Sequence, residues 1–408
     1  MMTNHDKHPL DERTIQIIKA TVPVLEDHGE TITTLFYKRL FENYPELKNL
    51  FNQTHQRAGD QPRALANMVY AAARHIENLG SVLPQVRTVA EKHRSLNVQP
   101  EHYPIVGEYL LKAMKEVLGD QATDEVLEAW GEAYGVIAGV FIDVEKNLYE
   151  EAEDQDGGWA DWRFMQVVDK VKESDEMTSF YLKPVDQQPL PRYKAGQYIT
   201  VKAQIEGESY DHLRQYSLSD APGHDYFRIT VKREAGSEHV PAGIVSTWLH
   251  DHVHVGDRLP VSAPAGDFHL DDRKRPLVLI SGGAGLTPLM SMQKEAAVRQ
   301  PERDVYVVHA ARHGNVHAFK EDMMKKKACF VYEQPTEEDI RSGAFHERGF
   351  VDLDVLQRTV PKDADFYFCG PKGFMTAVYR SLVEWGVEAD ALHYEFFGPQ
   401  EALVLRES

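Results

Sequence analysis

Three polar residues, His93, Tyr103 and Glu145, stand where the surrounding pattern is apolar. Each continues a run of apolar side chains spaced three or four residues apart, which is the spacing of one face of a helix. A histidine that binds a metal through one ring nitrogen is oriented, and made a stronger donor, by a buried acceptor at the other nitrogen. Glu145, together with Tyr103, could supply that acceptor, since an unpaired buried carboxylate is costly. Two simpler interpretations stay open at this stage: an ordinary core histidine, and a glutamate at a solvated helix end.

Tyr37 and Gln61 are two further polar residues beside predicted helix faces. Tyr37 aligns with Thr33 and Phe41, and Gln61 stands one helical turn before Leu65. On the far side of a metal centre these two residues would form a polar pocket. The alternative for Tyr37 is a plain core tyrosine, whose ring packs as any aromatic ring does.

A second group of residues suits a phosphate-bearing cofactor. Arg214-Gln215-Tyr216-Ser217 lies at the end of an expected strand and offers a charge, an aromatic face and a hydroxyl, which together suit a flavin. Gly243–Leu249, which includes Ser246, places a glycine and small polar groups at a predicted helix start, where free N–H groups bind a pyrophosphate. The alternative is a surface strand of no special function, since four residues are a short signal.

Two glycine-containing turns follow apolar runs nearer the carboxyl end. Ser281–Pro288 comes after the run that ends at Ile280 and opens a predicted helix, so its glycines would let a phosphate approach the backbone. It lacks the third glycine of the dinucleotide fingerprint G-x-G-x-x-G. Phe368-Cys369-Gly370-Pro371 ends another apolar run. Cys369 is either an apolar neighbour of a reaction site or a merely buried thiol.

The elements that must position these residues change in type along the chain. Up to about Tyr149 the apolar residues recur three and four apart, which predicts helices alone. The acidic stretch Glu150–Gly158, with its double glycine, marks the main domain boundary. From Phe164 the period is two, which predicts a small antiparallel β-barrel. From Pro276 short apolar runs alternate with helical stretches, which predicts an α/β domain whose parallel sheet is covered by helices.

Length and charge limit the classes of function. At 408 residues the chain is too long for one core, so two or three domains are expected. Its formal charge of −19 would repel phosphate backbones, so nucleic acid is not an expected partner. We expect no membrane-spanning segment and no secretory signal, because no long apolar run occurs. Two cysteines are too few for a disulfide framework; the expected compartment is a reducing cytoplasm, and no obligate protein partner is evident.

The helical part resembles the globin domain of bacterial flavohaemoglobins from about Leu10 to Tyr149. The motifs that carry this resemblance are Phe36–Phe41, Asn43–Lys48 running into Phe51, Gln56–Gln61 and Lys92-His93. It implies a haem b whose iron is bound by His93, with Tyr103 and Glu145 as the pair that hydrogen-bonds this ligand. The opposite side of the haem would hold four residues: Tyr37, which donates to iron-bound oxygen, Gln61 and Leu65, which line the pocket, and Phe51, which packs on the haem.

The other two parts resemble the flavin and nicotinamide domains of the ferredoxin-reductase family. The resemblance implies that FAD is held by Tyr198, Arg214, Gln215, Tyr216, Ser217 and Ser246. It implies nicotinamide contacts from two turns, which are Gly283, Ala284, Gly285, Leu286, Thr287 and Pro288, and then Cys369, Gly370 and Pro371. Near the carboxyl end it implies a terminal strand in which an aromatic residue, here Phe397, lies against the flavin, with Phe396, Gly398 and Pro399 also at the cofactor. Lys92 and Glu395 correspond to residues between flavin and haem that would shift both redox potentials, although by spacing alone both pass as surface charges.

The resemblance sets the expected architecture of a multidomain protein. The globin (haem) domain would span 1–149 and the linker 150–160. The FAD-binding β-barrel domain would span 161–272, and the NAD(P)H-binding α/β domain 273–408.

The expected activity, again by resemblance, is that of a nitric oxide dioxygenase: NAD(P)H reduces FAD, FAD reduces haem, and the small molecules O2 and NO become nitrate. The residues alone argue for less. A donor made electron-rich by Glu145, and Tyr37 on the other side, favour oxygen activation over storage. The alternatives are a haem-based sensor of oxygen or nitric oxide and an NADH oxidase with other acceptors. Arg312 could meet a 2′-phosphate, but no basic cluster surrounds it, so NADH is favoured over NADPH.

Overall fold

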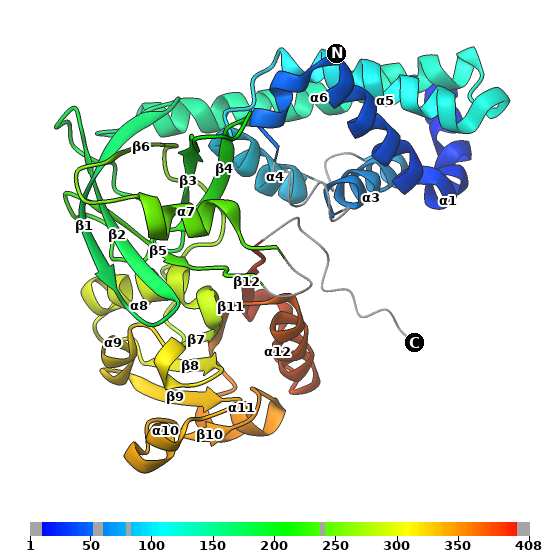
Figure 1. Ribbon diagram of the computed structural model, residues 1–408. Helices are drawn as coiled ribbons and strands as arrows, with labels where there is room; N and C mark the ends of the chain where they lie inside the picture. Colours follow the sequence, from blue (N-terminus) through cyan, green and yellow to red (C-terminus); the bar gives the residue numbers. More distant parts are fainter. Residues whose placement is uncertain (1–9, 52–59, 79–82, 237–240, 398–408) are drawn as a thin grey trace, which may run out of the picture. The chain divides into compact units, whose positions relative to one another are not determined.

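The described residues up to Glu153 form helices, as the apolar period predicts (Figure 1). The computed structural model describes residues 10–51, 60–78, 83–236 and 241–397. Within these, the first part contains α1 (Glu12–Asn43), η1 (Pro45–Asn49), α3 (Asp60–Arg74), α4 (Leu83–Ser95), α5 (His102–Leu118), η3 (Gly119–Gln121) and α6 (Asp124–Glu153). Among the helices described, none is long and apolar enough to cross a membrane.

The helix α1 supplies much of the helical core, because its apolar residues recur on one face. Ile18, Ile32 and Leu40 are each at most 2% exposed, and full burial of such a side chain contributes about 1.5–3 kcal/mol. The helix α3 packs against α1, where the Thr33 hydroxyl donates to the Pro62 carbonyl at 2.7 Å. This packing fixes the start of α3 beside the middle of α1.

The helix α6 continues farther than the sequence pattern predicts. It ends at Glu153, so Glu150–Glu153, the first residues of the expected linker, are helical. Its inward face carries Trp130, Phe141 and Glu145, each 5% exposed or less. A carboxylate therefore lies in an otherwise apolar stripe, as the spacing in the sequence predicts.

The chain folds into two compact units that are not simply consecutive. The first unit ends at Glu153 and also includes Gln204–Leu213, a loop between two strands together with the first two residues of the second strand. The second unit contains Asp154–Ala203 and the described residues from Arg214 on.

An antiparallel sheet of six strands follows α6, which confirms the predicted sheet of period two. Its strands are β1 (Arg163–Lys172), β2 (Met177–Pro184), β3 (Tyr198–Ala203), β4 (His212–Ser217), β5 (Phe227–Lys232) and β6 (Arg258–Val261), in the order β4-β3-β6-β1-β2-β5. In β1 the buried Met165 and Val167 alternate with the exposed Phe164 and the half-buried Gln166, as expected for a strand that has one face on a core. The helix α7 (Ile244–His252) lies between β5 and β6 along the chain.

A parallel sheet of six strands forms the last part of the described chain, as the apolar runs predict (Figure 1). Its strands are β7 (Leu277–Gly282), β8 (Val305–Ala311), β9 (Lys327–Tyr332), β10 (Glu347–Arg348), β11 (Asp365–Cys369) and β12 (Leu392–Glu395). The connecting helices are η4 (Gly283–Gly285), α8 (Leu286–Arg299), η5 (Gly314–Val316), α9 (Lys320–Met324), α10 (Glu337–Ser342), α11 (Leu353–Thr359), α12 (Lys372–Glu384) and η6 (Ala389–Ala391).

The strand β7 is buried on both faces. Leu277 and Leu279 belong to the core cluster that includes residues of α8, whereas Val278 and Ile280 belong to the cluster with α11 and α12. These helices therefore cover opposite faces of the sheet. The strand order is β10-β9-β8-β7-β11-β12, so the chain moves outward from β7 and then returns to its other side with β11. In such a sheet ligands bind outside the carboxyl ends of the strands at the reversal, which here are the ends of β7 and β11.

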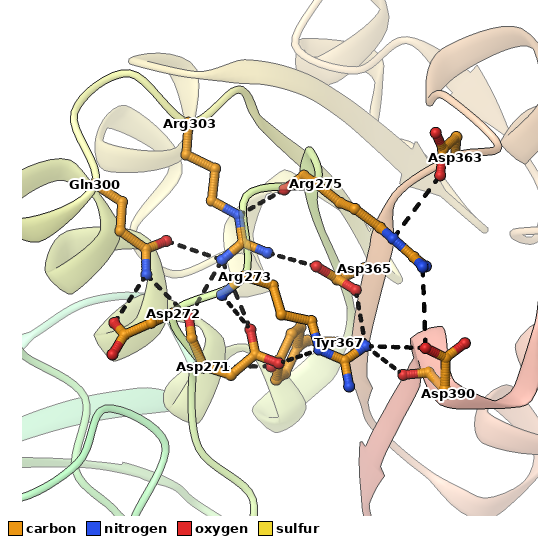
Figure 2. Close-up of polar contacts among 10 residues, drawn as sticks. All are labelled: Asp271, Asp272, Arg273, Arg275, Gln300, Arg303, Asp363, Asp365, Tyr367 and Asp390. Carbon is orange, nitrogen blue, oxygen red and sulfur yellow. Dashed lines mark hydrogen bonds and ion pairs between the residues drawn. The ribbon is translucent and has the colours of Figure 1, made fainter.

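A network of ion pairs holds the segment that joins the two sheets (Figure 2). Arg303 Nη2 donates to Asp365 Oδ2 at 2.8 Å, and these side chains are 3% and 0% exposed. Arg273, in the joining segment, approaches the same carboxylate at 3.3 Å, and Arg303 Nε donates to the Arg275 carbonyl at 2.7 Å. Removing one partner of a buried ion pair costs about 3–5 kcal/mol. The network therefore fixes the joining segment at the amino end of β11, away from the ends where ligands bind.

Candidate cofactor sites

His93, Tyr103 and Glu145, which come from α4, α5 and α6, meet in one hydrogen-bonded group. His93 Nδ1 lies 2.7 Å from Glu145 Oε1 and 3.2 Å from the Tyr103 hydroxyl, which donates to the same Glu145 oxygen at 2.6 Å. Glu145 is 3% exposed, and burial and the Glu145 charge raise the pKa of Tyr103, so its hydroxyl stays a donor. A carboxylate in this place keeps the His93 proton on Nδ1 and leaves the lone pair of Nε2 available. The structure thus brings together the three residues that the sequence singled out.

Two residues that sequence reasoning missed support this group. The Tyr134 hydroxyl donates to the Tyr103 carbonyl at 2.6 Å. A Cβ atom on Gly107 would lie 2.5 Å from a ring atom of Tyr134, so glycine at this position gives the tyrosine ring its room. The Phe141 ring lies 5.9 Å from the His93 ring, between centroids. In the sequence Tyr134 belongs to an apolar stripe of a predicted helix, and no sequence pattern indicates a role for Gly107.

Tyr37 and Gln61 present polar atoms that no described residue binds. Tyr37 is 9% exposed, and its ring lies 5.9 Å from that of Phe41 and 5.6 Å from that of Phe51. Burial raises the pKa of Tyr37, so its hydroxyl remains protonated. Gln61 Oε1 is buried and has no hydrogen-bond partner among the residues that the structure describes. Because buried polar atoms are nearly always hydrogen-bonded, this oxygen fits a site for a ligand.

The surroundings of these residues suit a haem. Phe51 and Leu65 are half-buried against the core cluster that contains Tyr37. The His93 side chain is 33% exposed, so its second ring nitrogen is accessible to a haem iron. In the described part of the chain no three His, Cys, Asp or Glu side chains gather to hold a bare metal ion. A haem iron, in contrast, needs a single protein ligand on this side.

Tyr198 and Arg214–Ser217 stand on the neighbouring strands β3 and β4. Tyr198 is 6% exposed and Ser217 is 5% exposed. Burial lowers the pKa of Arg214 and raises that of Tyr216, although a guanidinium remains charged in proteins. A half-buried cation beside aromatic rings and a hydroxyl is a donor set that suits the phosphate and ring of a flavin. Gln215 is half-buried in the same strand.

The Ser246 hydroxyl already has partners within the chain. It donates to the Gly243 carbonyl at 3.1 Å and accepts from the Glu234 N–H at 3.2 Å. These bonds connect the first turn of α7 to Glu234, which follows β5. The expected contact of Ser246 with FAD stays a prediction.

The turn Gly282–Gly285 after β7 touches the turn after β11. A Cβ atom on Gly285 would collide with the Cys369 carbonyl oxygen, so this close approach requires glycine. In the sheet Cys369 is paired with Ser281 on one side and with Glu395 on the other. Burial raises the pKa of the Cys369 thiol well above its usual value, so the thiol stays protonated. The two turns form one cradle at the reversal of strand order, which suits a dinucleotide.

The remaining predicted residues lie around these turns or at the ends of elements. Leu286, Thr287 and Pro288 are buried in the first turn of α8, Ala284 is half-buried in η4, and Gly370 and Pro371 lead into α12. Phe396 is half-buried and Phe397 is 50% exposed, while Gly398 and Pro399 lie outside the described residues. Lys92 is half-buried in α4, and Glu395 is the half-buried last residue of β12.

A chain of buried polar groups lies behind the glycine turn, and sequence reasoning missed it. Ser281 Oγ lies 2.7 Å from His309 Nδ1, and His317 Nδ1 lies 2.8 Å from the Tyr332 hydroxyl. The two imidazole rings are 4.3 Å apart, between centroids. Burial lowers the pKa of His309 to about 3 and that of His317 well below its usual value. Both rings are therefore neutral near pH 7, because they are buried in the α/β core.

These neutral histidines predict a loss of stability in mild acid. The unfolded chain binds the His309 proton near pH 6.5, whereas the folded chain resists it down to about pH 3. The stability is thus complete above about pH 6.5 and is lost as the pH falls, by about 2 kcal/mol at pH 5. In calorimetry we expect the melting temperature to drop by about 4–8 °C between pH 7 and pH 5 from this residue.

The matched variant for this test is His309→Asn, because an amide can still bond to Ser281 but does not titrate. Its melting temperature is expected to fall less over the same pH range than that of the unaltered protein. Equal drops in both proteins would show that His309 does not contribute to the acid sensitivity.

Comparisons with known proteins agree with the division into three parts. The Globin family model matches residues 34–141. The model of the oxidoreductase FAD-binding domain matches residues 165–270, and that of the oxidoreductase NAD-binding domain matches residues 279–380. A globin joined to these two domains defines a haem–flavin oxidoreductase, with haem and FAD as cofactors and an NAD-binding domain.

Relatives along nearly the whole chain identify the family. The flavohemoprotein of Oceanobacillus iheyensis is 54% identical over 97% of this chain and 98% of its own. That of Bacillus subtilis is 49% identical over 97% of this chain and 99% of its own. The chain belongs to the flavohemoprotein family.

Solved structures are similar to the whole chain and to its second part. The flavohemoglobin of Malassezia yamatoensis, solved with bound FAD and haem, is 28% identical with a TM-score of 0.82 and covers 95% of this chain and 100% of its own. The FAD/NAD-binding domain of nitric oxide dioxygenase from Vibrio cholerae is 37% identical with a TM-score of 0.53, over 59% of this chain and 100% of that one.

Proposed function

We propose that this oxidoreductase is a nitric oxide dioxygenase, which converts nitric oxide and dioxygen to nitrate with electrons from NAD(P)H. The observation that carries the proposal is the buried Glu145 carboxylate, which bonds to both His93 and Tyr103. An anionic acceptor makes the imidazole a stronger donor, which favours dioxygen activation over storage. The name of the Vibrio cholerae relative supports the same activity. When bound, the cofactors supply hydride uptake, at FAD, and one-electron and dioxygen chemistry, at haem.

In the proposed haem site the chain's own residues act from both sides. His93 would hold the iron through Nε2, with Glu145 keeping the proton on Nδ1 and Tyr103 orienting the carboxylate. The Tyr37 hydroxyl would be a donor to a small ligand, and Gln61 would offer its buried oxygen or its amide. A fixed donor in a dry pocket stabilises charge that develops during the reaction. Phe51 and Leu65 keep this pocket apolar.

In the proposed reductase, buried polar groups hold FAD and glycine turns hold the nicotinamide cofactor. Arg214 and Ser217 bind the FAD phosphates, with Gln215 and Ser246 beside them, and the rings of Tyr198 and Tyr216 flank the flavin. The turn Gly283–Pro288 would bind the pyrophosphate, and the turn Cys369–Pro371 would line the transfer site. Phe396 and Phe397 would lie against the flavin, and Lys92 and Glu395 would adjust the two redox potentials through their charges.

The proposal also includes the limits of the domains and a cytoplasmic location. We assign 1–149 to the globin domain, 150–160 to the linker, 161–272 to the FAD domain and 273–408 to the NAD(P)H domain. Both cysteines, Cys329 and Cys369, are buried and free, which supports the expected reducing cytoplasm.

The yield of nitrate per NADH tests the proposed activity. Nitric oxide and dioxygen need one further electron to become nitrate (NO + O2 + e⁻ → NO3⁻), and NADH supplies a pair. Stopped-flow mixing with quantified nitrate is therefore expected to give about two nitrates per NADH oxidised. A sensor would form little nitrate, and an oxidase with other acceptors would consume NADH at its full rate without nitric oxide. Either result would reject the proposal.

Tyr37→Phe is expected to lower the rate of nitrate formation at least about tenfold, because it removes the hydroxyl donor and keeps the ring. Haem content and flavin reduction by NADH are expected to stay as they are. Tyr70→Phe, which removes a hydroxyl from a half-buried tyrosine in α3, serves as the matched control. Altered oxygen binding with unchanged nitrate turnover would assign Tyr37 to ligand storage instead.

A further inference from the structure

The loop after β8 lies beside the place that the pyrophosphate of a dinucleotide occupies in the proposed function. The strand β8 is the neighbour of β7 on the side away from β11. If the pyrophosphate lies on the glycine turn after β7 and the nicotinamide faces the turn after β11, the adenosine half extends over the end of β8. In folds of this kind an acidic residue there favours the free ribose hydroxyl of NADH, and a free arginine favours the 2′-phosphate of NADPH.

Arg312 is the first residue after β8, but its guanidinium is already engaged. It forms an ion pair with the Glu176 carboxylate, through Nη2 and Oε1. The Arg312 side chain is 55% exposed, and that of Glu176 is 27% exposed. The arginine is thus within reach of a ligand, and a carboxylate lies directly beside it.

Backbone hydrogen bonds fix the turn that carries Glu176. Glu176 lies in the turn between β1 and β2, and its carbonyl accepts from the Arg233 N–H at 2.7 Å. The neighbouring Asp175 N–H donates to the Asn315 carbonyl at 2.9 Å, which ties this turn to the loop after β8. The backbone segments that carry Glu176 and Arg312 are therefore held beside each other.

Other charges near the loop are also mainly acidic. The Asp339 carboxylate accepts from the Gly314 N–H at 3.0 Å and is 5% exposed as a residue. Glu333 stands opposite the end of β8, where its N–H donates to the Ala311 carbonyl at 3.1 Å. Lys320 lies close enough to Asp339 to interact with it, so it offsets one of these charges.

We propose that Glu176 makes this chain select NADH over NADPH. Its carboxylate occupies Arg312 and repels an added 2′-phosphate, whereas an uncharged ribose hydroxyl can bond to a carboxylate. This inference rests on the proposed function, because it requires that the glycine turn binds a nicotinamide dinucleotide.

The test is calorimetric titration of the holoprotein with NAD⁺ and with NADP⁺. The unaltered protein is expected to bind NAD⁺ at least about tenfold more tightly. In Glu176→Gln the Kd for NADP⁺ is expected to fall about tenfold, the size expected when one carboxylate is removed from beside a doubly charged phosphate at the surface. The ratio of flavin-reduction rates with NADPH and NADH, followed without oxygen, is expected to rise by a similar factor.

Two further variants make the result specific. Asp175→Asn removes the same charge from the adjacent exposed carboxylate and is expected to change the Kd ratio less than about twofold. Arg312→Ala added to Glu176→Gln is expected to reverse most of the fall in the Kd for NADP⁺, because the Arg312 guanidinium binds the 2′-phosphate once Glu176 no longer pairs with it. An unchanged Kd ratio in Glu176→Gln, or tight NADP⁺ binding by the unaltered protein, would overturn the selectivity inference alone. Binding of neither nucleotide would overturn the proposed function with it, whereas nucleotide binding with no nitrate formation would count against the dioxygenase only.

Discussion

Replacing His93 with alanine is expected to abolish normal haem ligation and to lower nitrate formation on the order of a hundredfold or more. The reason is geometric: Glu145 holds Nδ1 at 2.7 Å and leaves Nε2 of the same ring available for iron. Alanine removes the ligand, and it also removes one donor to a buried carboxylate. The absorption spectrum of the reduced protein measures the ligation, and the flavin spectrum shows whether the reductase remains intact.

Two companion variants separate a lost ligand from a misfolded protein. His75→Ala removes an exposed histidine of the helical unit and is expected to leave the haem spectrum as it is. His93→Gly leaves room for imidazole from solution, so added imidazole is expected to restore part of the spectrum and of the activity. If His93→Ala kept the spectrum of the unaltered protein, the iron ligand would have to be another residue.

Glu145→Gln is expected to keep haem bound while lowering nitrate turnover about ten- to a hundredfold. The amide can still accept from the Tyr103 hydroxyl, but it lacks the charge that makes His93 electron-rich. Loss of a negative charge near the iron destabilises the ferric state, so the haem reduction potential is expected to rise. Because Glu145 is 3% exposed, the neutral side chain is not expected to destabilise the fold.

The control for this substitution lies on the same helix. Glu150→Gln removes an equal charge from an exposed side chain of α6. Among the ion pairs described, Glu150 has one partner, Lys146, at 3.9 Å. It is expected to change neither the potential nor the turnover. Unchanged turnover and reduction potential in Glu145→Gln would contradict the inference that the His93–Glu145–Tyr103 group sets the reduction potential of the haem iron.

The sequence predicts much of the haem site because helix periodicity is local. Glu145 stands four residues after Phe141 on the same stripe, so spacing places it on the inward face, and the structure decides between burial and a solvated helix end. The order of the parts follows in the same way, because the change from a period near four to a period of two marks the start of the antiparallel sheet. In β7 an unbroken apolar run correctly indicates a strand buried on both faces.

Other features depend on contacts between distant residues, which no local pattern records. Tyr134 reaches the Tyr103 carbonyl only because Gly107 has no side chain. His309 lies in an apolar strand, but nothing in the sequence shows that its partner is Ser281, one strand away. The Glu176–Arg312 pair joins residues from the two sheets, so it could not be seen before the fold was known.

The loop Gln204–Leu213 has a consequence for attempts to dissect the protein into separately expressed pieces. It groups with the helical unit, where the Asp211 N–H donates to Asn49 Oδ1 at 2.8 Å and Lys48 lies 5.1 Å from the Tyr210 ring centroid. If the gene is cut after Glu153, the expressed reductase contains this loop without the helical residues that it contacts. A stand-alone reductase would therefore be better built with the loop replaced by a short polar turn.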